Sequence, residues 1–136
     1  MRLTINVDGG ARGNPGPAAI GVVVRDADGE VVREVSEAIG VSTNNVAEYR
    51  ALLKGVAVAR ELGAGELEII GDSELVARQL TGEYRVKNAA LKPLREGVLR
   101  ALNGVRWTIR TVPRAQNSRA DALVNAALDR SVDELC

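Results

Sequence analysis

The first forty residues contain three segments rich in apolar residues, and the first of these alternates between apolar and polar positions with the period of two that is typical of β-strands. Residues 3–8 show this alternation clearly, and residues 19–25 and 31–39 predict two further strands. Residues 26–29 join these two strands and end in Asp-Gly, a common turn sequence. Because such a connection is short, we expect the first three strands to form an antiparallel meander.

From Val46 onward the apolar residues recur every three or four positions, which predicts an amphipathic helix that ends just before Gly63. The other expected elements are a buried strand at 66–71, a short helix at 73–80, a helix at about 91–102, a strand at 105–110 and a last helix from 118 to about 129. Three strands followed by alternating helices and strands indicate an α/β fold, in which a mixed sheet has helices on both faces.

Composition limits what this fold can contain. A chain of 136 residues, 46% of them hydrophobic, has the size of one domain, so we interpret residues 1–136 as a single domain. It has no Phe, one Trp and two Tyr, so aliphatic residues must form the core, and base stacking is not an expected mode of binding. Eighteen basic and eighteen acidic residues cancel, which argues against binding nucleic acid through net charge alone. Residues 130–136 show little pattern and are expected to form a disordered tail.

Cysteine and histidine usage narrows the chemistry further. The only cysteine is Cys136, so no intramolecular disulfide can form, which fits a reducing compartment. No apolar run approaches the ~18 residues of a membrane span, and no leader segment precedes the first strand, so a cytoplasmic location is expected. The chain has no histidine, which makes carboxylates the expected metal ligands.

Four carboxylates occupy corresponding places in the expected elements. Asp8 ends the first strand, and Asp72 directly follows the fourth. Glu48 and Asp121 lie in the first turns of the first and last long helices. Because strand ends and helix starts at one edge of a sheet can converge, we expect the four side chains to lie together.

Each of these acids also has a simpler interpretation. Asp8 before Gly-Gly is typical of a turn, and Asp72 can stabilise the start of the helix that follows it. Residues 45–48 and 118–121 both match a helix capping box. These interpretations stay open for each residue alone, but independent caps would have no reason to share one edge.

A cluster of this kind suits metal chemistry. Carboxylates close together repel one another strongly in a low dielectric, and divalent cations between them remove that cost. Two Mg²⁺ ions roughly 3.5–4 Å apart can activate a water, stabilise the transition state and neutralise the departing oxygen. The predicted cluster therefore favours metal-assisted hydrolysis of a phosphodiester.

The order and separation of four segments resemble the motifs of type 1 ribonuclease H, which cuts the RNA strand of RNA–DNA hybrids. The segments are DGGARGNPGPAAIG, TNNVAEYRALLKGV, IIGDSELVARQLTGEYRVKN and VPRAQNSRADALVNAAL, and the similarity covers about residues 2–129. The resemblance implies the ribonuclease H-like fold. Its five-stranded mixed sheet combines a three-stranded antiparallel meander with two parallel strands and has helices on both faces.

The resemblance also implies a function. Asp8, Glu48, Asp72 and Asp121 would be the catalytic acids and would bind two Mg²⁺ ions, which Mn²⁺ can replace. The expected enzyme is a monomeric endoribonuclease that cuts RNA–DNA hybrids to 5′-phosphate and 3′-hydroxyl ends, with action on double-stranded RNA left open. Two alternatives also remain, a binding module without cleavage and a nuclease of the same fold with another substrate.

The glycine-rich segment at residues 10–16 lacks the G-x-G-x-x-G spacing, and a strand follows it, so a dinucleotide site is not expected. The resemblance instead assigns Gly10, Asn14, Asn44 and Asn45 to contacts with the minor groove and the ribose hydroxyls of a hybrid. Helix capping is an equal alternative for Asn44 and Asn45.

The chain departs from the family pattern in several places. Many bacterial members have a histidine before the last acid, whereas PRAQNSRAD resembles the archaeal-like branch that lacks it. Arg114 is the candidate replacement and Asn117 a further auxiliary residue, with a solvated loop charge as the alternative for Arg114.

Glu74 stands where relatives often have Gln, and residues 81–91 are too short for the basic protrusion of some members. A smaller phosphate-binding face, or simply a solvated surface, would comprise Arg78, Arg85, Lys87, Lys92 and Arg95.

Overall fold

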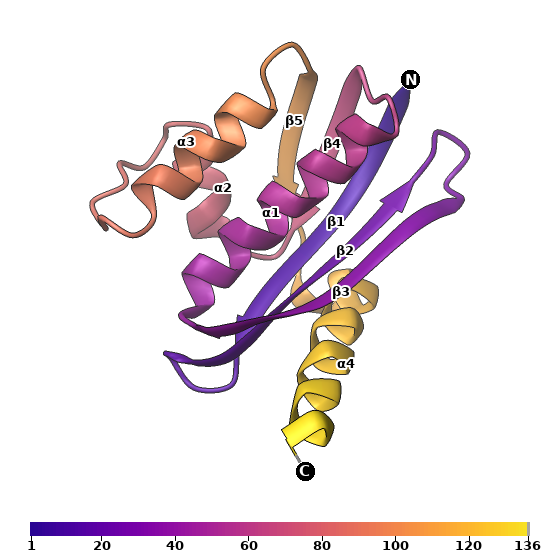
Figure 1. Ribbon diagram of the computed structural model, residues 1–136. Helices are drawn as coiled ribbons and strands as arrows, with labels where there is room; N and C mark the ends of the chain where they lie inside the picture. The colour runs from indigo at the N-terminus through magenta and orange to yellow at the C-terminus, as the bar shows by residue number, and fades with distance from the viewer. Residues whose placement is uncertain (136) are drawn as a thin grey trace.

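The computed structural model describes residues 1–135, which form one sheet with helices on both faces (Figure 1). The elements are β1 (Arg2–Ala11), β2 (Gly16–Arg25), β3 (Val31–Ser42), α1 (Asn44–Glu61), β4 (Glu66–Gly71), α2 (Glu74–Leu80), α3 (Lys92–Ala101), β5 (Arg106–Thr111), the 3₁₀ turn η1 (Arg114–Asn117) and α4 (Ser118–Leu135). The strand order is β3-β2-β1-β4-β5. β1, β2 and β3 pair antiparallel, whereas β4 pairs parallel with β1 and β5. The predicted combination of a meander and two parallel strands is confirmed.

Strand β1 is longer than its sequence pattern predicts. Residues 9–11 continue to pair with β2, although Gly-Gly is a typical turn sequence. The prediction that Asp8 ends this strand is therefore wrong, because cross-strand pairing outweighs the local preference. On its other side, β1 stops pairing with β4 at the Asn6–Ile70 pair. The two strands thus separate just before Val7 and Asp8.

Helix α1 begins two residues before the predicted position. Its N-cap is Thr43, whose hydroxyl accepts a hydrogen bond from the Val46 N–H at 3.3 Å. The capping box predicted for residues 45–48 is therefore wrong, and Glu48 is not needed as a cap. The helix ends as predicted just before Gly63, which adopts a positive φ of 92°.

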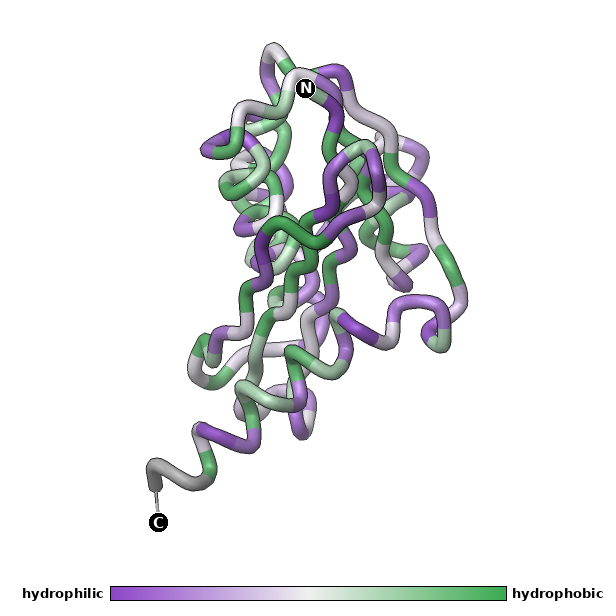
Figure 2. Tube along the Cα trace, turned by 90° about the vertical axis from the view of Figure 1, so that its right-hand side faces the viewer, coloured by the Kyte–Doolittle hydropathy of each residue, from purple (hydrophilic) through white to green (hydrophobic). Residues whose placement is uncertain are grey.

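The two faces of the sheet have cores of different size. On the face covered by α1, a large aliphatic cluster fills the space between the sheet, α1 and α3, with Tyr49 fully buried in it. On the face covered by α4, the cluster contains only Ala19, Val124, Ala127 and Leu128 among the described residues. The trace in Figure 2 changes repeatedly between hydrophobic and hydrophilic positions, as expected for elements with one buried side.

Helix α4 starts at the predicted residue, Ser118, but continues to Leu135. The predicted disordered tail is therefore corrected for residues 130–135, which are helical, while Cys136 lies outside the described residues. Within the described part of the chain, none of the helices combines the length and apolar character that a bilayer crossing requires. The first strand begins at one end of the molecule, and α4 extends away from the opposite end (Figures 1 and 2).

Candidate active site

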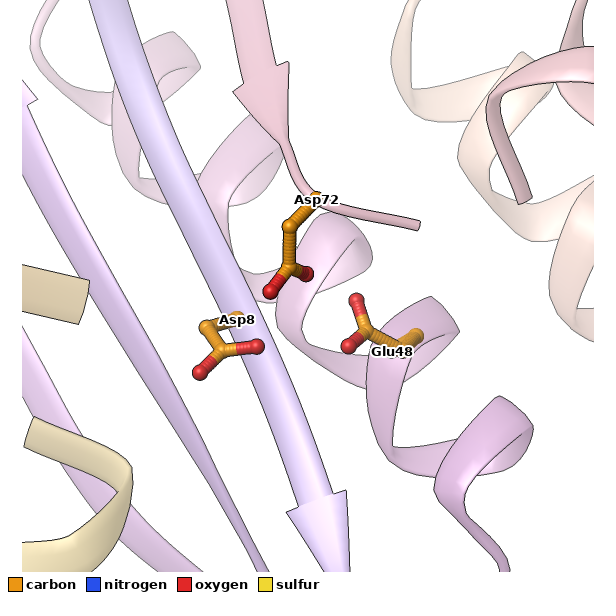
Figure 3. Close-up of side chains that lie close together, drawn as sticks. All are labelled: Asp8, Glu48 and Asp72. Atoms are coloured by element: carbon orange, nitrogen blue, oxygen red, sulfur yellow. The ribbon is translucent and has the colours of Figure 1, made fainter. Parts of the chain in front are cut away.

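Three of the four predicted acids meet where β1 and β4 separate. Asp8 comes from β1, Asp72 follows β4, and Glu48 comes from the first turns of α1. Each offers a carboxylate oxygen, and these oxygens all lie within 4.8 Å of one another. Figure 3 shows the three side chains pointing toward a common point. Asp8 is 4% exposed, whereas the other two are half-buried, so the cluster opens toward solvent.

The fourth acid, Asp121, reaches the same place from α4. It lines the same cleft, of about 620 Å³, and contributes to raising the pKa of Asp8. It does not belong to the group of three whose oxygens are mutually within 4.8 Å among the described residues. Nη2 of Arg114 lies 3.5 Å from its Oδ1, and Nδ2 of Asn125 donates to its Oδ2 at 3.4 Å. Asp121 therefore lies beside the cluster, where Arg114 and Asn125 bind its carboxylate.

Two glycines allow the helices that carry Glu48 and Asp121 to approach the sheet. A Cβ on Gly9 would overlap the backbone of Ala47, directly before Glu48 in α1. A Cβ on Gly21, which pairs with Asp8, would overlap the carbonyl of Ala120 in α4. Only glycine permits backbone contact this close, so these positions bring two acids to Asp8 from opposite faces.

The crowding of the acids changes their protonation. Burial, followed by the charges of Asp72 and Asp121, raises the pKa of Asp8 from 3.8 to about 7. Burial and then the charges of Asp8 and Asp72 raise the pKa of Glu48 from 4.5 to about 9. Without a cation, the cluster therefore retains protons at neutral pH. A hard divalent cation prefers oxygen ligands and would replace those protons, so the donor set fits such an ion.

The glycine-rich segment is tied to the start of α1 by asparagine side chains. Asn44 Oδ1 accepts a hydrogen bond from the Ala11 N–H at 2.8 Å, and the Asn44 N–H donates to Asn14 Oδ1 at 3.0 Å. Asn45 and Gly10 line the cleft beside the acids. Because Thr43 is the N-cap, the capping alternative for Asn44 and Asn45 is wrong. Asn44 and Asn45 thus line the cleft without capping α1.

The two auxiliary candidates lie in different environments. The side chain of Arg114 is 79% exposed and lines the cleft near Asp121. Asn117 is 2% exposed, and both ends of its amide are bound within the protein. Asn117 therefore cannot reach a substrate without leaving those partners.

The basic residues predicted as a phosphate-binding face are partly neutralised. Arg78 binds Glu74 at 2.7 Å and Glu83 at 2.8 Å, and its guanidinium lies over the ring of Tyr84. Three others, Arg85, Lys92 and Arg95, line a separate cleft of about 600 Å³. Glu74 is thus held by Arg78.

Two residues that shape the site, Gly21 and Asn125, are absent from the sequence-based candidates. Gly21 interrupts a continuous apolar strand, AIGVVV, and an isolated glycine in a strand is a signal of close backbone approach. Asn125 lies four residues after Asp121, a spacing that puts both side chains on one helix face. Both residues could therefore have been found from the sequence.

Comparison with known proteins supports the same fold and family resemblance. A family model described as reverse transcriptase-like matches residues 6–127. The chain is 47% identical over 129 residues to ribonuclease HI of Halobacterium salinarum, covering 94% of this chain and 65% of that protein. It is 32% identical to ribonuclease H of Erythrobacter litoralis, covering 94% of this chain and 96% of that protein. The chain spans 36% of a bifunctional Mycobacterium tuberculosis protein to which it is 46% identical.

Solved structures agree with these relatives. The crystal structure of RNase H1 from Halobacterium salinarum matches with a TM-score of 0.93 at 45% identity, covering 96% of this chain and 99% of that one. LC11-RNase H1, solved in complex with an RNA/DNA hybrid, matches with a TM-score of 0.91 at 41% identity, covering 96% and 99%. Sequence motifs, strand order and structural match thus lead to one family, and this chain belongs to type 1 ribonuclease H.

Proposed function

We propose that this chain is a divalent-metal-dependent endoribonuclease that hydrolyses the RNA strand of RNA–DNA hybrids to 5′-phosphate and 3′-hydroxyl products. The observation that carries the proposal is the convergence of Asp8, Glu48, Asp72 and Asp121 from four separate elements on one open cleft. Its family relatives are ribonucleases H, and LC11-RNase H1 was solved with a hybrid bound. A cytoplasmic location and a monomeric state stay predictions, and action on double-stranded RNA is left open.

The four acids would hold two Mg²⁺ ions, with Mn²⁺ as a substitute. When bound, these ions would supply Lewis acidity, a more acidic water and neutralisation of the leaving oxygen. Asp8 is the central ligand in this proposal because it is the most buried of the four and interacts with the other carboxyl groups. Asp121, on its own helix, would complete the site from the other face of the sheet.

The neutral residues beside the acids would recognise the ribose. The side-chain oxygen of Asn44 is already bound to the Ala11 N–H, so its amide NH₂ group is the part that can donate to a substrate hydroxyl. Asn14 supports it by accepting from the Asn44 backbone. Gly10 and Asn45 add backbone and amide groups along the same cleft, which suits contacts to a 2′-hydroxyl.

The test is cleavage of a labelled hybrid, a duplex RNA and a DNA duplex with a single ribonucleotide, first with Mg²⁺ and then with Mn²⁺. Asp8→Asn should lower hybrid cleavage by about 10³-fold or more while hybrid binding persists, because several kcal/mol of metal-dependent stabilisation is lost. Glu66→Gln is the matched control, since Glu66 is exposed at the opposite end of β4 from Asp72.

Each result separates the proposal from its alternatives. A wild-type protein that binds hybrid with metal present but never cuts it would be a binding module. Faster cleavage of duplex RNA than of hybrid would indicate the related nuclease. If Asp8→Asn kept full activity, the carboxylate cluster would not be the catalytic centre.

A further inference from the structure

A chain of hydrogen bonds runs beside the acid cluster and connects β2, β1 and η1. Arg25 Nη1 donates to Asn6 Oδ1 at 3.0 Å, and Asn6 Nδ2 donates to Asn117 Oδ1 at 3.1 Å. Asn117 Nδ2 then donates to the backbone oxygen of Val7 at 2.9 Å. We call this chain of Arg25, Asn6, Asn117 and the Val7 carbonyl the relay.

The relay lies where the sheet is interrupted. The pairing of β1 with β4 ends at Asn6, so Val7 is the first residue of β1 without a β4 partner. Its carbonyl is buried beside the site, and a buried carbonyl left without a hydrogen bond destabilises the fold. The amide of Asn117 binds that carbonyl in place of a neighbouring strand.

The chemistry of the two ends fixes the direction of the relay. A guanidinium can only donate hydrogen bonds, and a backbone carbonyl can only accept them. The two amides between Arg25 and Val7 must therefore both point their NH₂ groups toward Val7. This gives the Asn117 amide a single orientation. A carboxylate in its place has only acceptors and could not donate to the Val7 carbonyl.

Both ends of the final bond adjoin acids of the site. Val7 directly precedes Asp8, and Asn117 directly precedes α4, which carries Asp121 four residues later. We propose that Asn117 is a positioning residue that holds the start of α4 against β1, so that Asp121 stays beside Asp8. It acts through the backbone and never touches the substrate. The expected effect of Asn117 on cleavage rests on the proposed function, whereas its effect on the position of Asp121 does not.

The kinetic test compares Asn117→Ala with Asn103→Ala, an exposed asparagine in the turn after α3. Asn117→Ala should lower kcat for hybrid cleavage by about 10- to 100-fold and change KM by less than about twofold, since misplaced catalytic groups lower the chemical step. Asn117→Asp should lower kcat further, because a carboxylate would face the Val7 carbonyl. Asn103→Ala should change neither constant.

The structural test uses the ¹³Cγ resonance of Asp121 in the metal-free protein, which reports its contact with Asp8 without any catalysis. This resonance should shift in Asn117→Ala and stay in place in Asn103→Ala. If Asn117→Ala does not fold, Asn6→Ala removes the preceding bond and should give a smaller shift in the same direction.

The outcomes separate the two proposals. If the wild type does not cut hybrid, the proposed function fails, while the shift of the Asp121 resonance still tests positioning. An unchanged Asp121 resonance in Asn117→Ala would overturn the positioning role, as would a loss expressed in KM alone.

Discussion

The two faces of the sheet are held by different kinds of contact. The α1 face is sealed by a continuous aliphatic core that includes Leu67 and Tyr49. The α4 face has a small apolar cluster and relies on hydrogen bonds and ion pairs. These include Ser36 Oγ to the Leu123 carbonyl at 2.6 Å, Arg12 to Asp129 at 2.7 Å, Arg119 to Glu34 at 2.7 Å and Arg130 to the Ser36 carbonyl at 2.8 Å.

This difference separates stability from alignment. Apolar burial scales with area and has no direction, so the α1 face contributes most of the folding free energy. Hydrogen bonds contribute less but depend on geometry, so the α4 face determines where its helix lies. Asp121 is carried by the second face, and the other three acids belong to β1, α1 and the end of β4. We therefore expect damage to the two faces to have different effects.

The largest effect on stability should come from the α1 face. Leu67→Ala, at a side chain only 1% exposed, should lower the free energy of unfolding by about 2–5 kcal/mol by leaving a cavity. Hybrid cleavage measured well below the melting temperature should stay within about twofold of wild type, because Leu67 lies at the other end of β4 from Asp72. Leu128→Ala, in the smaller cluster, should cost less stability. Urea unfolding gives both values, and a larger cost for Leu128→Ala would contradict the comparison.

The two glycine contacts test the faces as a matched pair. Gly9→Ala would push α1 away from β1, and Gly21→Ala would push α4 away from β2. Overpacking of this kind typically costs about 1–3 kcal/mol, and Gly9→Ala should cost more because α1 carries the larger core. Both variants should lower cleavage at least about tenfold, since each displaces an acid. Equal unfolding free energies for the two variants would argue against a division of roles between the faces.

The pH dependence of the metal-free protein should be set by the acids between the faces. The folded-state pKa values of Asp8 and Glu48, about 7 and about 9, lie above their ordinary values of 3.8 and 4.5. Between about pH 4 and about pH 9 the folded state therefore binds more protons than the unfolded state. The free energy of unfolding should fall as the pH rises through this range. Thermal melts with a chelator should show this fall, and Asp8→Asn should reduce it.

Addition of Mg²⁺ at pH 8 should raise the melting temperature of the wild type more than that of Asp8→Asn, because the ion binds the folded state preferentially. Identical shifts for the two proteins would mean that the metal binds elsewhere.

The smallest effect should come from a single surface pair on the α4 face. Arg119 and Glu34 are both substantially exposed, and the hydrogen bond from Arg119 lowers the pKa of Glu34. Arg119→Ala should leave the melting temperature nearly unchanged at moderate salt, since exposed ion pairs are weak and screened. A clear loss of stability that persists at 1 M salt would show that this pair contributes more than its exposure implies.

The sequence predicts this fold well where the signal is local. Residues 66–71 form a buried strand with the predicted bounds, because a short apolar run between glycine and aspartate is too short for a helix. The same patterns misplace the end of β1 and the start of α1, since β2 pairing and Thr43 decide these positions. They also underestimate the length of α4, because its last turns have a weak apolar pattern.

The candidate site could be predicted only in part. The four acids can be identified through their places in the elements and a family resemblance, and the structure brings them together. Asn117 is an auxiliary candidate from the sequence, but its bond to Val7 could not be foreseen, because no local pattern marks a contact between distant segments. The same limit applies to the contacts of Gly9 and Gly21, whose partners belong to separate helices.

The hydrogen bond between Asn6 and Asn117 also affects how the chain folds as it is made. The two residues are 111 positions apart, so β1 leaves the ribosome long before its partner exists. Such non-local contacts slow folding, and a nascent chain keeps the β4-facing edge of β1 open until later segments arrive. The fourth acid joins the other three only when the last helix docks. Chains interrupted before that point can collapse around α1, yet they lack a complete site.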